Sequence, residues 1–163
     1  DAWPVDARRP DTFPEAYEVA RVEALLALGR AEEARALLLE VSARLNASAN
    51  PYPVGWNGLA PVSPARVPGL LGDLAGVRAA EHDYLNAPRD EWSKDVIYPE
   101  LALAFLRAGD RGRAMNYLEQ EANLFGPQRY LDESVDPRSD SLRDHPRYRA
   151  YRARYEAWAT QQH

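Results

Sequence analysis

Apolar residues recur at helical spacing in the first part of the chain. Residues 14–28 carry two apolar stripes, one through Tyr17, Ala20, Ala24, Leu25 and Leu28, the other through Val19, Val22 and Leu26. A helix that is apolar on two sides is normally packed between neighbours. Gly29 follows and predicts the helix end, because glycine adopts the left-handed cap conformation at least cost.

A second helix is predicted to begin at about residue 31. Its apolar stripe comprises Ala34, Leu37, Leu38, Val41 and Leu45. Glu40 and Arg44 lie off this stripe and predict a favourable i,i+4 ion pair. Because the turn between the two helices is very short, residues 14–46 predict an antiparallel helical hairpin.

Residues 47–67 interrupt the helical pattern with a concentration of proline, asparagine and glycine, which predicts a loop. Loops of about 20 residues inside compact domains are uncommon and often functional. This one carries Tyr52 and Trp56. Trp56 either pins the loop against the helices, which we favour because exposed large apolar side chains are uncommon, or serves as an exposed anchor for a partner.

Helical spacing returns after this loop. It predicts an extra helix over 68–85, a second hairpin over 92–125 with its turn at Gly109, and a final helix over 146–161. Three glycines, Gly69, Gly72 and Gly76, should each weaken the helix over 68–85 by about 1 kcal/mol relative to alanine. The sequence therefore predicts a single all-α domain of about six helices.

Aromatic residues dominate the apolar stripe of the final helix, which comprises Tyr148, Tyr151, Tyr155 and Trp158. Such a stripe predicts that the helix docks on the preceding hairpin as a C-terminal cap. The same segment carries a run of arginines from Arg143 to Arg154. We interpret this run as a solvated helix face, and the alternative is a docking surface for an anionic peptide or another domain.

Composition narrows the function classes. The 163-residue chain has no cysteine, which excludes disulfides and thiolate zinc sites, and a net charge of −5, which argues against general nucleic-acid binding. No apolar run is long enough to span a membrane. Nineteen of the 20 basic residues are arginine, which suggests a GC-rich bacterial genome, and the start at Asp1 suggests a piece of a longer protein.

Catalytic and metal-binding patterns are absent from the sequence. Walker loops, dinucleotide fingerprints and nucleophile elbows do not occur, so we expect neither enzymatic activity nor a cofactor. His82 is flanked by Glu81 and Asp83, but consecutive helical residues point about 100° apart and cannot converge on one metal. We therefore interpret His82 as a surface residue beside solvated carboxylates, and expect no metal site.

Two segments 80 residues apart resemble each other: "LLALGRAEEARALL" at 25–38 and "FLRAGDRGRAMNYL" at 105–118. Each has a large apolar residue, a glycine turn, an alanine five residues later and a leucine four residues further on. This pattern resembles the tetratricopeptide repeat. The resemblance implies stacked antiparallel hairpins in a short right-handed superhelix, although Glu121 stands where the repeat prefers alanine and the offset is not a multiple of about 34 residues.

The phrase "DSLRDHPRYRAYRARY" at 140–155 resembles the end of C-terminal repeat domains in bacterial multidomain signalling proteins. These proteins include membrane-anchored winged-helix regulators, class III nucleotide cyclases and some Ser/Thr kinases. The resemblance implies a module of a larger signalling protein. A link to the membrane-anchored regulators would favour a periplasmic or other extracytoplasmic location over a cytoplasmic one, and nothing in the residues decides it.

The tetratricopeptide resemblance also implies a binding surface, because the first helix of each hairpin lines the concave groove of such repeats. The expected partner-binding residues are Glu23, Leu26, Trp56, Trp92, Leu103, Leu106 and Arg107. The predicted function is protein–protein interaction, with a peptide or a domain bound in the groove. Two alternatives are an accessory domain that packs on the catalytic domain of its own polypeptide, and a homo-oligomerisation module.

Overall fold

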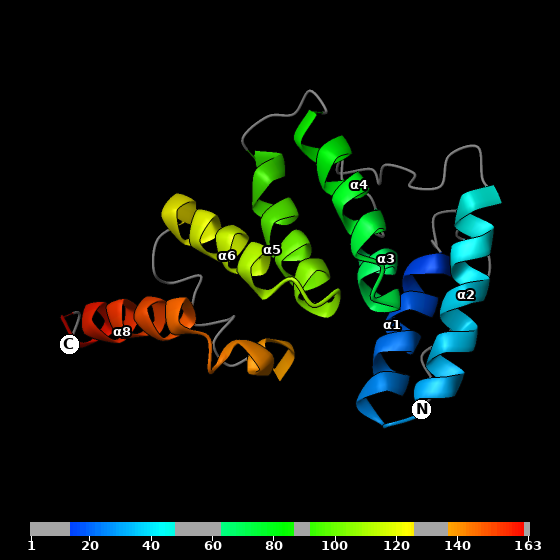
Figure 1. Cartoon of the computed structure of the whole chain (residues 1–163), viewed down its shortest axis with the longest axis horizontal. Helices are drawn as coiled ribbons and strands as arrows, with labels where there is room; N and C mark the ends of the chain where they lie inside the picture. Colours follow the sequence, from blue (N-terminus) through cyan, green and yellow to red (C-terminus); the bar gives the residue numbers. More distant parts are fainter. Residues whose placement is uncertain (1–13, 48–62, 87–91, 126–136, 162–163) are drawn as a thin grey trace, which may run out of the picture. The chain divides into compact units, whose positions relative to one another are not determined.

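A computed structural model describes residues 14–47, 63–86, 92–125 and 137–161, and within these ranges the protein is entirely helical (Figure 1). The elements in chain order are α1 (Pro14–Ala27), α2 (Ala31–Ala47), α3 (Arg66–Leu71), α4 (Leu74–Asn86), α5 (Trp92–Arg107), α6 (Arg111–Phe125), the 3₁₀ helix η1 (Pro137–Leu142) and α8 (Pro146–Gln161). The prediction of an all-α fold is confirmed for this part of the chain. In the same ranges no helix has both the length and the apolar character that crossing a membrane requires.

The chain divides into two compact units, Asp1–Val62 and Ser63–His163. The boundary falls inside the proline-rich segment predicted as a loop. Residues 48–62 of that segment, including Tyr52 and Trp56, lie outside the described residues. Its end was predicted too late, because helix α3 already begins at Arg66. Whether the two units act as one domain stays a prediction.

The first unit contains the hairpin of α1 and α2. Val19 and Val22 of one predicted α1 stripe are buried, and so is Leu25 of the other. On α2, Ala34, Leu38, Val41 and Leu45 of the predicted stripe are buried, and Leu37 is half-buried. Each predicted α1 stripe also has exposed members: Tyr17 and Leu28 of one are each 71 % exposed, and Leu26 of the other is 43 % exposed. Within the hairpin, α2 therefore covers one face of α1, and packing of the other face stays a prediction.

An ion pair between the two helices of this hairpin replaces the one predicted within α2. Arg44 was expected to pair with Glu40, but its guanidinium donates a hydrogen bond to the carboxylate of Glu18 on α1. The antiparallel arrangement brings the end of α2 beside the start of α1, so the longer-range partner is within reach. Pairs of this exposed kind contribute roughly 0–1 kcal/mol.

The second unit is built around α5, which contacts α3, α4, α6 and η1, while α8 contacts α6. Leu101 and Phe105 of α5 are completely buried, together with Met115 of α6 and Leu142 of η1. The aromatic stripe of α8 joins the same core: Tyr148, Tyr151 and Tyr155 are buried and Trp158 packs against them. The predicted docking of the last helix is thereby confirmed.

The single helix predicted over 68–85 is two helices. Gly72 ends α3 with a left-handed φ of 72°, and Asp73 starts α4 by accepting a hydrogen bond from the Gly76 N–H at 3.0 Å. The interruption has a direct cause, because an L-residue at a positive φ is strained whereas glycine is not. The short helix α3 can then lie against α5, where Gly69 approaches the backbone of Ala104.

The two hairpins turn in the same way, 80 residues apart. Gly29 and Gly109 have φ values of 72° and 86°, and both donate to the carbonyl three residues back. The following N–H, of Arg30 or Asp110, donates at 2.9 Å to the carbonyl five residues back. Ala34 and Ala114 are both buried, at equivalent positions in the following helices. The internal similarity of the sequence therefore has a counterpart in backbone geometry.

Candidate functional site

The predicted partner-binding residues fall in two separate units. Glu23 and Leu26 lie on α1, whereas Leu103, Leu106 and Arg107 lie near the end of α5. Trp92 is the first residue of α5, but its side chain, like all of Trp56, lies outside what the structure describes. Each group is therefore considered within its own unit.

These residues differ in how much surface they offer. Leu26 is 43 % exposed and accessible to a partner, whereas Leu103 is only 9 % exposed. Leu106 is half-buried and packs against the core cluster of the second unit. Glu23 and Arg107 are partly exposed and already make contacts within the protein. Within the second unit, Arg107 is thus a better candidate for direct contact than Leu103.

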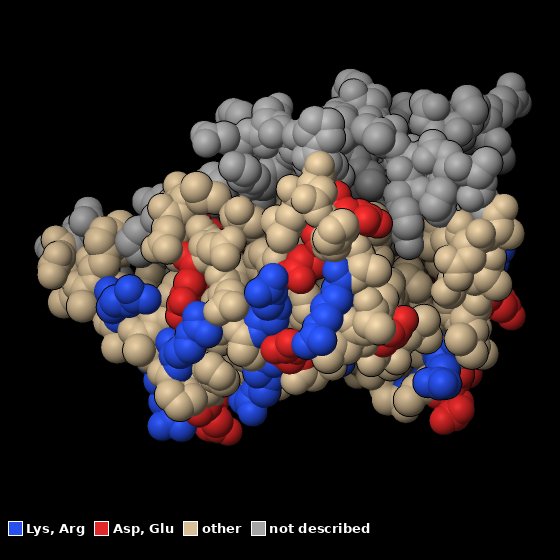
Figure 2. Space-filling model, turned by 45° about the horizontal axis from the view of Figure 1, so that its top comes forward, with Lys and Arg blue, Asp and Glu red and all other residues tan. Residues whose placement is uncertain are grey.

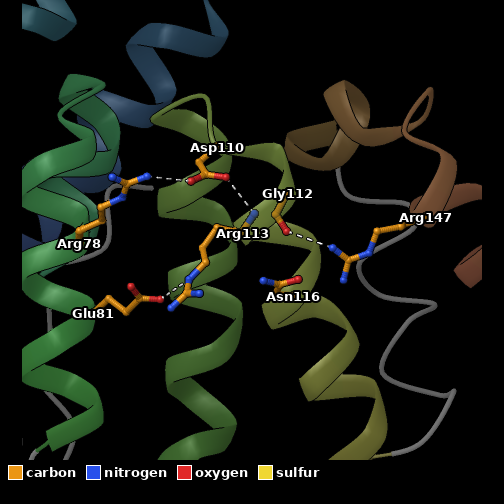
Figure 3. Close-up of a pocket in the computed structure, with 7 residues that line it drawn as sticks. All are labelled: Arg78, Glu81, Asp110, Gly112, Arg113, Asn116 and Arg147. Carbon is orange, nitrogen blue, oxygen red and sulfur yellow. Dashed lines mark hydrogen bonds and ion pairs between the residues drawn. The ribbon is translucent and has the colours of Figure 1, made fainter.

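A polar pocket of about 540 Å³ lies elsewhere on the second unit, and sequence reasoning did not find it (Figure 3). Its walls come from α4, from the turn before α6, from α6 and from α8. The lining residues are Arg78, Glu81, Asp110, Gly112, Arg113, Asn116 and Arg147. Three guanidinium groups from three helices therefore converge on one opening, which we call the arginine pocket.

Glu81 anchors the wall formed by α4. Its carboxylate is buried, with the residue 8 % exposed, and accepts hydrogen bonds from Arg113 Nε at 2.6 Å and from the Tyr117 hydroxyl. The interpretation of Glu81 as a solvated neighbour of His82 was therefore wrong. Asp83, by contrast, has an 85 % exposed side chain, as that interpretation required.

The surroundings of Glu81 raise the pKa of both groups that donate hydrogen bonds to it, so both keep the protons that they donate. Burial raises the pKa of Tyr117 above its ordinary value, and the hydrogen bond to Glu81 adds to the increase, so the phenol stays protonated. The hydrogen bond to Glu81 also raises the pKa of Arg113. The Tyr117 hydroxyl and the Arg113 guanidinium thus satisfy a buried carboxylate that would otherwise be costly to bury.

Stacking holds the Arg113 guanidinium as well. Its central carbon lies 5.7 Å from the ring centre of Tyr117 and 6.0 Å from that of Phe105. Those two rings stack on each other with centroids 5.9 Å apart and an interplanar angle of 11°. A planar cation held by a carboxylate and two aromatic rings is fixed in position, and it presents its remaining donors in a set orientation.

Arg78 is held much more weakly. Its guanidinium lies 3.4 Å from Asp110 Oδ2, and its side chain is 62 % exposed. Asp110 has a second partner, because its Oδ1 accepts the Arg113 backbone N–H at 2.9 Å and so caps α6. Arg78 can therefore leave Asp110 without depriving that carboxylate of its hydrogen bond.

Arg147 forms the opposite wall, from the first turn of α8. It binds Glu119 in bidentate fashion, through Nε at 3.1 Å and through a second nitrogen at 2.6 Å, and it also donates to the Gly112 carbonyl at 3.4 Å. The hydrogen bond to Glu119 raises the pKa of Arg147. Within the arginine run of α8, Arg147 is thus a half-buried tether to α6, whereas Arg149 and Arg154 lie on an exposed face.

Charges of both signs alternate on this surface, and Figure 2 shows arginine side chains beside carboxylates rather than a continuous patch of one sign. Histidine, serine and threonine are absent from the pocket lining. Both of its carboxylates are engaged by Arg78 or Arg113. Among the described residues, no group of three or more potential ligands could hold a metal ion. The arrangement suits recognition of a charged group through guanidinium hydrogen bonds.

Comparisons with protein-family models, with curated proteins and with solved structures gave no match to this chain. Similarity to known proteins therefore assigns neither a family nor a ligand to this chain.

Proposed function

We propose that this chain is a tetratricopeptide-like interaction module of a larger bacterial signalling protein, and that it binds a peptide or domain of a protein partner. It carries out no catalysis of its own. In this proposal the helical hairpins stack as a short right-handed superhelix, with the first helix of each hairpin facing a concave groove.

The observation that carries the proposal is the repeated hairpin. Two antiparallel helix pairs, α1–α2 and α5–α6, share the same glycine turn, the same pattern of cap hydrogen bonds and a buried alanine at the same place. Repetition of one supersecondary unit is the signature of helical repeat proteins, whose extended surfaces commonly bind other proteins. The exposed Leu26 on α1 adds an apolar contact point on a first helix.

The test compares partner selection by two double variants. A phage-displayed library of random peptides is selected on the wild-type chain, and the enriched peptides are then measured against Glu23→Ala/Arg107→Ala and against Glu32→Ala/Arg154→Ala. The second pair makes the same changes in charge at exposed positions on α2 and α8. A groove that includes the first helices predicts that only the Glu23/Arg107 variant loses binding.

Two outcomes would count against this function. If no peptide family is enriched, or if both variants lose binding equally, a specific groove on the first helices is excluded. The alternative of a homo-oligomerisation module makes its own prediction, which is a mass above that of one 18.3 kDa chain in light scattering of the unliganded protein. A monomer without peptide ligands would leave the accessory-domain alternative as the better one.

A further inference from the structure

We infer that the arginine pocket is a second binding site, which takes a carboxylate side chain from an acidic segment of a protein partner. Its residues lie on α4, α6 and α8 and in the turn before α6, and none of them belongs to the predicted groove. The site extends the proposed function to another surface and does not depend on the groove residues Glu23 and Arg107.

The donors that would recognise a carboxylate are already in place. Glu81 and two aromatic rings fix Arg113, and Glu119 fixes Arg147 in bidentate geometry. In the view of Figure 3 the side-chain amide of Asn116 lies between these two guanidinium groups. A guanidinium has five N–H donors, and the bond to Glu81 occupies one of those of Arg113. Fixed donors lose little conformational entropy when a ligand binds.

Arg78 supplies the exchangeable part of the site. Its contact with Asp110 is long and exposed, and pairs of this kind contribute little to stability. Asp110 keeps its capping bond to the Arg113 N–H when Arg78 moves away. An incoming carboxylate can therefore take the place of Asp110 on Arg78 in a one-for-one exchange that leaves no buried charge unpaired.

The charge balance favours a carboxylate over a phosphate. Three arginines of the pocket face three carboxylates of the protein, namely Glu81, Asp110 and Glu119. A monocarboxylate adds one negative charge to this site and can pair with Arg78 in place of Asp110, whereas a dianionic phosphoryl group adds two negative charges close to the same carboxylates. The same carboxylates and the net charge of −5 disfavour nucleic acid.

The dimensions of the pocket favour a side chain on a peptide over a small free acid. A volume of about 540 Å³ exceeds what one carboxylate fills, and the pocket is open to solvent, so a longer ligand can extend beyond it. A peptide in which glutamates alternate with small residues would place one carboxylate in the pocket and others at its rim.

The test is a fluorescence-polarisation titration of the whole chain with three labelled peptides. The first alternates Glu with Gly and Ser, the second has Gln at each Glu position, and the third has phosphoserine there. The test variant is Arg78→Gln, and the matched control is Arg154→Gln, which removes the same charge from an exposed site on α8. We expect Arg78→Gln to weaken binding of the Glu peptide by about fivefold or more, Arg154→Gln to change it less than about twofold, and the Gln peptide not to bind.

Three results would overturn the inference: no binding of the Glu peptide at about 1 mM, an equal loss with Arg78→Gln and Arg154→Gln, or tighter binding of the phosphoserine peptide. The first two exclude a specific carboxylate site, and the third changes the ligand class to phosphate. Thermal unfolding of each variant checks that it is folded. The Glu23→Ala/Arg107→Ala variant should bind the Glu peptide as the wild type does, so failure of the groove and failure of this pocket are distinguishable.

Discussion

The substitution Gly69→Ala tests how closely α3 and α5 approach each other. A Cβ at position 69 would lie 2.7 Å from the Cα and 3.0 Å from the Cβ of Ala104, whereas ordinary contacts begin at 3.4 Å. The neighbouring atoms belong to the α5 backbone and to the first atom of its side chain, so no flexible group can move aside. The two helices would have to separate by roughly 0.7 Å to relieve the contact.

Two opposing terms set the size of the effect. Overpacking of a well-packed core costs about 1–3 kcal/mol, and replacing a helical glycine by alanine returns up to about 1 kcal/mol of helix propensity. We therefore expect Gly69→Ala to lower the free energy of unfolding by about 1–2 kcal/mol. From the sequence alone the expected sign is the opposite, because alanine is the better helix former.

Gly112→Ala is the matched control. Gly112 also lies in a helix, but a Cβ there would meet nothing closer than Asp110 Oδ1 at 3.8 Å. Without a steric penalty, this substitution should raise the free energy of unfolding by about 0.5–1 kcal/mol. Urea unfolding followed by far-ultraviolet circular dichroism measures both. An increase in stability for Gly69→Ala comparable to that for Gly112→Ala would refute the close approach of α3 to α5.

The second unit allows three further tests. The raised pKa of Tyr117 means that the unfolded chain loses this proton at lower pH than the folded protein, so this contribution to stability is complete below pH about 10 and falls as pH rises further. Urea unfolding at increasing alkaline pH should show a smaller decline for Tyr117→Phe than for the wild type, and equal declines would contradict the shift. Phe105→Ala should cost about 3–5 kcal/mol, measured by urea unfolding, because the ring is fully buried and stacks on Tyr117. Gly109→Ala should cost about 1–2 kcal/mol because its φ is 86°, and an unchanged midpoint in thermal unfolding would show that the turn does not need glycine.

Local signals in the sequence were enough to predict most helix boundaries. The turns at Gly29 and Gly109 lie where the glycines placed them, and the final helix spans the predicted 146–161. The break at Gly72 was missed although its signal was present. Gly72-Asp73 repeats Gly109-Asp110, and in both cases the glycine has a positive φ and the aspartate caps the next helix. A glycine followed directly by a capping aspartate predicts a break between two helices, whereas a glycine alone predicts only a loss of helix propensity.

The arginine pocket could be predicted from the sequence only in part. Glu81 lies on the same stripe of α4 as Val77 and Tyr84, and a charged residue on an apolar stripe indicates a buried group that needs a partner. That signal could have identified Glu81 as unusual. It could not have named Arg113 and Tyr117, which are 32 and 36 residues away in the chain, because their approach depends on how α4 and α6 pack around α5.

A buried carboxylate of this kind has consequences for specificity as well as for stability. Replacing a buried ion pair by apolar residues often leaves stability unchanged or increases it, so stability alone does not explain Glu81. What the carboxylate does provide is a fixed position for the Arg113 guanidinium, whose other donors line an open pocket. Glu81→Gln can still accept a hydrogen bond from Arg113 while the charge pair is lost. If the pocket binds an acidic segment, this variant should weaken the positioning of Arg113 and reduce affinity for the Glu peptide, even where its unfolding free energy is close to that of the wild type.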